Sequence, residues 1–120
     1  MTDRRIAQLM AFVAATLVVA SALHLSGAVG DESAPFHPDR AGVAEAVIAV
    51  VLAAGAAALL QGARAVALAA VVFAIAGFGI GLSMTVRGGG AADIAYHAAT
   101  LPVLLLALAL LSRRAASIQV

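Results

Sequence analysis

The sequence contains no cysteine, no lysine and no tryptophan, and it has few charged residues of either sign. The absence of cysteine excludes disulfides, iron–sulfur clusters, thiolate metal sites and thiol chemistry. Only 11% of the 120 residues are charged, against roughly 25% in an ordinary soluble domain, and 64% are hydrophobic. A soluble fold of this size cannot bury so much apolar surface, so the composition indicates one integral membrane domain.

The basic residues are too few and too scattered to form a nucleic-acid-binding face. The formal net charge is +1, and all seven basic residues are arginine. This excludes the basic patch that nucleic acid requires. Abundant alanine, glycine and valine without lysine is typical of a GC-rich bacterial genome, so we expect the inner (cytoplasmic) membrane of a bacterium as the location.

Four apolar segments are each long enough to cross a bilayer, because a spanning helix needs about 20 predominantly apolar residues. We predict helices over residues 6–29, 41–60, 65–86 and 92–111. Ala20-Ser21-Ala22 is similar to a signal-peptidase site, but the first apolar run is longer than the ~7–15 residues of a signal peptide core, and we expect no cleavage. Short turns between the later helices favour antiparallel neighbours. The fold expected is an all-α, up-down-up-down transmembrane four-helix bundle.

The arginines are unevenly divided between the two ends of this predicted bundle, five against two. The five are Arg4, Arg5, Arg64, Arg113 and Arg114, and the two are Arg40 and Arg87. Positive residues concentrate on the cytoplasmic side, so both termini are expected in the cytoplasm. The partners expected are the lipid bilayer and either further copies of the chain or a larger membrane complex, because a bundle of four helices buries little of each.

Ionisable residues within the predicted spans gather at one depth. His24, Glu45 and His97 lie on three different helices, each four or five residues inside the outer end, or roughly 6–8 Å below the outer boundary at the rise of an α-helix. Asp93 precedes His97 by one helical turn on the same face. His37 lies in the loop above them. Placing such residues in a membrane is unfavourable in free energy, and they usually face the interior of a bundle.

Imidazole and carboxylate groups are ligands that divalent transition metals prefer. The sequence therefore predicts a metal site of His24, Glu45 and His97, with Asp93 and His37 as further candidate ligands and zinc, copper or iron as the ion. Three other interpretations remain open: a polar cluster that only fixes helix packing in an accessory subunit, a proton-coupled transporter acting through Glu45, and a haem held by His24 and His97. Two histidines and a carboxylate can also activate oxygen or water, but no motif names a substrate, and the sequence does not indicate an enzyme.

Overall fold

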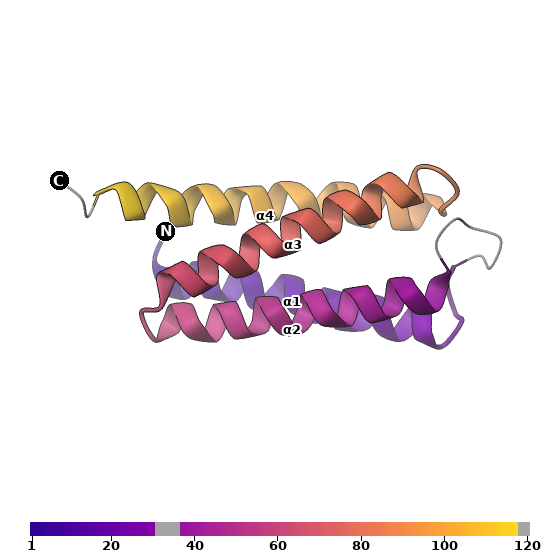
Figure 1. Ribbon diagram of the computed structural model, residues 1–120, viewed down its shortest axis with the longest axis horizontal. Coiled ribbons are helices and arrows are strands. Elements are labelled where there is room, and N and C mark those ends of the chain that lie inside the picture. Colours follow the sequence, from indigo (N-terminus) through magenta and orange to yellow (C-terminus); the bar gives the residue numbers. More distant parts are fainter. Residues whose placement is uncertain (31–36, 118–120) are drawn as a thin grey trace.

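The computed structural model describes residues 1–30 and 37–117, and the regular secondary structure in this part of the chain is entirely α-helical. The helices are α1 (Asp3–Leu25), α2 (Pro38–Leu60), α3 (Arg64–Thr85) and α4 (Ala91–Ser117). α1 packs along α2, α2 against α3, and α3 against α4, in an elongated bundle (Figure 1). The middle of the predicted loop, residues 31–36, lies outside the described residues, as do the side chains from Arg114 onward.

All four helices are long and apolar enough to cross a membrane. They contain 22 to 27 residues. At 1.5 Å per residue, even the shortest extends about 33 Å, against a hydrocarbon thickness of about 30 Å. The architecture is therefore that of a multi-pass membrane protein.

Local capping places both ends of α1 earlier than the apolar run predicts. The side chain of Thr2 accepts a hydrogen bond from the backbone N–H of Arg5 at 3.4 Å, so the helix begins at Asp3 rather than at residue 6. Gly27 has φ +76°, a left-handed conformation that commonly follows the end of a helix. The helix accordingly ends at Leu25 rather than at residue 29.

α2 and α4 are longer than their apolar segments. Proline suits the first position of a helix, where its missing N–H costs no hydrogen bond, and α2 begins at Pro38 rather than at residue 41. The imidazole Nδ1 of His37 accepts a hydrogen bond from the N–H of Asp39 at 3.3 Å and so caps this helix. α4 continues to Ser117, beyond residue 111, because the polar residues at its end are neither glycine nor proline and need not stop the helix.

Glycine residues let the helices approach closely. A Cβ atom added at Gly55 of α2 would lie 2.5 Å from the Cβ of Ala70 in α3. In α3, a Cβ at Gly77 would lie 2.5 Å from Ile48, and one at Gly81 would lie 2.5 Å from the imidazole Nε2 of His97. The G-x-x-x-G pair of α3 thus packs against helices of its own bundle.

Replacement of Gly55 by alanine is expected to lower the free energy of unfolding by about 1–3 kcal/mol, because the Cβ of Ala70 cannot move unless α3 moves. Gly79→Ala is the matched control, since a Cβ there meets nothing within 4 Å. Alanine should leave stability unchanged or raise it at that position. SDS-induced unfolding in detergent micelles measures both variants, and equal losses would show that close packing at Gly55 is unimportant.

One arginine links three helices near the end of the bundle that holds the N-terminus. The guanidinium of Arg64, at the start of α3, donates to the Asp3 carboxylate of α1 at 2.8 Å. It also donates to the backbone carbonyls of Leu110 and Leu111 in α4 at 3.1–3.2 Å. These are charge-assisted hydrogen bonds, the stronger kind.

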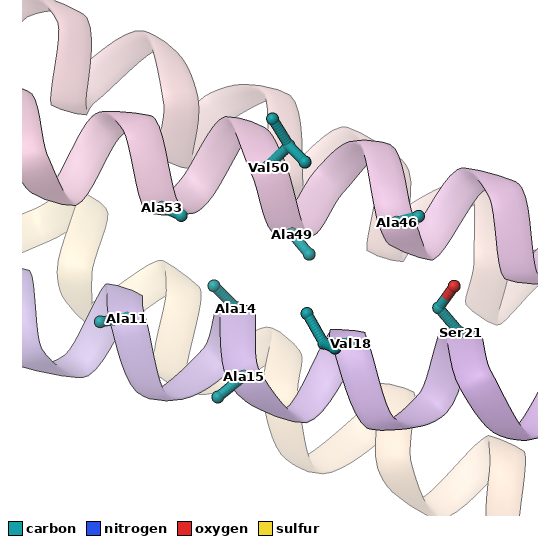
Figure 2. A pocket seen from close by; sticks show the side chains of 9 residues that line it. All are labelled: Ala11, Ala14, Ala15, Val18, Ser21, Ala46, Ala49, Val50 and Ala53. Carbon is teal, nitrogen blue, oxygen red and sulfur yellow. The ribbon is translucent and has the colours of Figure 1, made fainter.

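A shallow apolar hollow of about 400 Å³ lies between α1 and α2. Figure 2 shows Ala14 and Val18 of α1 and Ala49 of α2 directed into the gap between the two helices. The only polar side chain in its lining is Ser21, whose hydroxyl donates to the carbonyl of Gly42 at 2.7 Å. The hollow contains no ionisable group and offers no chemistry beyond apolar contact.

Candidate metal centre

His24 and Glu45 form a buried pair near the end of the bundle opposite to Arg64. His24 lies in the last turn of α1, and Glu45 lies in α2, two turns from its start. The imidazole Nδ1 and the carboxylate Oε2 are 2.8 Å apart, and the two residues are only 4% and 6% exposed. The antiparallel packing of α1 and α2 therefore brings together two residues that the sequence placed at one depth.

Asp93, in the first turn of α4, completes a cluster with this pair. Its carboxylate Oδ2 lies 3.6 Å from the second imidazole nitrogen of His24, Nε2. One ligand atom from each of His24, Glu45 and Asp93 can be chosen so that all three lie within 4.8 Å of one another. Three helices thus contribute one oxygen or nitrogen donor each to a single point.

With a neutral His24, the cluster has more acidic than basic groups. A neutral imidazole has a single N–H, so His24 can donate to Glu45 or to Asp93 but not to both. If Nδ1 donates to Glu45, then the lone pair of Nε2 faces the Asp93 carboxylate across 3.6 Å. A further proton or a metal cation on that side would replace this repulsion with attraction.

His97 lies beside the cluster but outside it. Its Nδ1 bonds to the backbone carbonyl of Asp93 at 2.8 Å and lies 3.9 Å from the Asp93 carboxylate. Its other nitrogen, Nε2, is directed toward Gly81 and has no hydrogen-bond partner among the described residues. The structure therefore brings Asp93, rather than His97, to His24 and Glu45.

His37 lies away from the other candidates. Its side chain is 47% exposed, and its Nδ1 lies 3.7 Å from the carboxylate of Asp39. Because Nδ1 also caps α2, the ring is held at the surface.

Two aromatic residues beside the cluster were not singled out from the sequence. The ring centroids of Phe78 and Tyr96 are 5.8 Å apart, and that of His97 is 5.3 Å from Phe78 and 5.8 Å from Tyr96. The Tyr96 hydroxyl also shares a hydrogen bond of 2.9 Å with the hydroxyl of Thr16 in α1. The available signals were that Tyr96, the only tyrosine, precedes His97 directly, and that Phe78 lies between the two glycines of the G-x-x-x-G pair.

A cavity of about 970 Å³ adjoins the cluster and is lined by all four helices. His24, Glu45, Asp93 and His97 form its ionisable wall, and most of the remaining lining is apolar or glycine. Unlike the hollow in Figure 2, this cavity combines buried charge with space for a ligand. It is therefore the candidate functional site.

Comparisons with known proteins identify no relative of this chain: no family model, no curated protein and no solved structure matches it. The function is accordingly argued from the site alone.

Proposed function

We propose that this chain is a multi-pass membrane protein that binds one divalent transition metal ion through His24, Glu45 and Asp93. The observation that carries the proposal is the convergence of three donor atoms from three helices within 4.8 Å of one another. Intramembrane ionisable residues are expensive, and a shared function accounts for three at one point.

The donor set suits zinc, iron or divalent copper, which accept imidazole nitrogen together with carboxylate oxygen. Zinc binds such atoms at about 2.0–2.2 Å in tetrahedral geometry, so two ligand atoms of one ion are about 3.3–3.6 Å apart. The observed spread of up to 4.8 Å therefore needs the most distant pair to approach by about 1.2–1.5 Å on binding. Monovalent copper prefers sulfur and would require Met84, which lines the same cavity.

In this proposal, His97 does not bind the ion itself, because its Nδ1 bonds to the backbone carbonyl of Asp93 and its Nε2 is directed toward Gly81. His37 takes no part. A haem between His24 and His97 is less well supported, because the Asp93 carboxylate approaches both imidazoles, at 3.6 and 3.9 Å. A porphyrin plane would have to occupy the same space.

We further propose an up-down-up-down topology with both termini in the cytoplasm, as the distribution of arginines favours. Figure 1 supports this arrangement, since α1 begins and α4 ends at the same end of the bundle. The metal centre then lies near the outer face of the bacterial inner membrane.

The second candidate function is a proton-coupled carrier, and the position of His24 between two carboxylates favours it. A cluster that lacks positive charge can take up a proton in place of a metal ion. If the protein is such a carrier, transport across the membrane of reconstituted liposomes should depend on pH. The Glu45→Gln variant should lose this transport.

Metal analysis of the purified protein tests the main proposal. After growth with added zinc, iron or copper, we expect about one ion per wild-type chain, and less than about 0.2 in Glu45→Gln and Asp93→Asn. His37→Ala is the matched control and should retain the ion. A wild-type chain with less than about 0.2 ion after supplementation would refute the proposal and leave a polar packing cluster, as in an accessory subunit.

A further inference from the structure

The cavity beside the cluster is far larger than a metal ion requires. Its volume of about 970 Å³ compares with about 30 Å³ for one water molecule in the liquid. Small-molecule sites in proteins typically measure about 300–1,000 Å³. The volume therefore points to an organic ligand.

The charge of the cavity wall indicates the sign of the charge on that ligand. Glu45 and Asp93 line the cavity, whereas no arginine is among the described residues that line it. The Oε1 atom of Glu45 accepts no hydrogen bond from the described residues, although its side chain is only 8% exposed. Among the described residues no fully buried side-chain oxygen lacks a hydrogen-bond partner, so this oxygen is accessible rather than fully buried. A carboxylate oxygen that is accessible at the cavity wall attracts a cation and repels an anionic headgroup.

The cavity also has aromatic side chains in its wall and an opening at the surface of the bundle. Phe78 and Tyr96 line the cavity next to the carboxylates, and the faces of aromatic rings attract cations. Val19 and Leu23 of α1, which also line it, are 60% and 42% exposed. The cavity thus reaches the outer surface of the bundle at an apolar stretch of α1, from which an amphiphile dissolved in lipid can enter.

We propose that this cavity binds an apolar organic cation, a lipophilic ammonium or phosphonium ion, with Glu45 and Asp93 as its counter-charges and Phe78 and Tyr96 as its aromatic wall. The inference goes beyond metal binding and does not require it. Because both ligands use the same carboxylates, the organic cation and the metal ion exclude one another.

Equilibrium dialysis of tetraphenylphosphonium against the purified protein in detergent micelles tests the inference. Triphenylphosphine oxide, which is similar in shape but uncharged, measures simple partitioning into the micelle. We expect saturable binding of the cation alone. The double variant Glu45→Gln/Asp93→Asn should weaken it at least about tenfold, because buried charge pairs contribute strongly to affinity.

Asp39→Asn is the matched control, since this carboxylate lies at the same end of the bundle but is 68% exposed and does not line the cavity. Equal binding of the charged and uncharged probes, or equal weakening by Asp39→Asn, would overturn the inference. The single variant Asp93→Asn gives a second test if the double variant does not fold, because this side chain is 27% exposed, and it should also weaken binding of the cation. Binding of the cation without any metal affinity would refute only the metal proposal, and the reverse result would refute only this one.

Discussion

Replacement of His24 by leucine is expected to lower the free energy of unfolding by about 3–5 kcal/mol, because it leaves the Glu45 carboxylate buried without its partner. Both side chains are almost fully buried, so solvent offers little compensation. Metal binding should be lost at the same time. Unfolding by SDS in mixed micelles measures the first effect, and metal analysis measures the second.

The double variant His24→Leu/Glu45→Leu separates these two effects. Replacing a buried pair with apolar residues of similar size is often neutral or stabilising, and we expect stability within about 1 kcal/mol of the wild type. The product would be a folded bundle that cannot bind the ion. His37→Leu serves as the control for histidine removal at an exposed position. If the double variant is as unstable as His24→Leu, then the cost of an unpaired carboxylate does not explain the loss.

Replacement of Arg64 by methionine is the second large effect that we expect, a loss of at least about 2 kcal/mol. The variant keeps an apolar side chain of similar length but removes the hydrogen bonds to the carbonyls of Leu110 and Leu111. The contribution of Asp3 is smaller, because its side chain is 42% exposed and solvent weakens the ion pair. The same unfolding assay measures the loss.

Two further variants test this explanation of Arg64. Arg64→Lys can keep the ion pair with Asp3, but it lacks the planar fork that reaches both carbonyls, so it should recover only part of the stability. Arg4→Met removes an exposed arginine from the same end of the bundle and should change little. If Arg4→Met matches Arg64→Met, then general charge at this end, rather than the specific hydrogen bonds, determines stability.

The helices could be predicted because unbroken apolar runs of this length have few alternatives to spanning helices. Their ends could not, since hydropathy does not detect a capping Thr2 or a proline at the first position of α2. The contacts of Arg64 could not be predicted either. Its charge indicated a side of the membrane, but the three-way contact depends on where α1 and α4 meet it, which no local pattern records.

The candidate site could likewise be predicted only in part. Counting residues from the helix ends placed His24 and Glu45 at one depth, and the structure brings them to 2.8 Å. Counting could not decide between Asp93 and His97, because two residues one turn apart share a helix face. Depth and tilt of α4 decide which of the two side chains reaches His24, and both depend on packing against α3, where Gly81 accommodates the imidazole of His97.

The positions of the polar contacts between α1 and α4 have a mechanical consequence. These two helices pack less extensively than the sequential pairs, and near the cavity they are joined through His24 with Asp93 and through Thr16 with Tyr96. Arg64 links both helices at the opposite end. An ion bound between His24 and Asp93, as proposed, would add a further link between α1 and α4 at the cavity end and so restrain a helix pair that packs weakly.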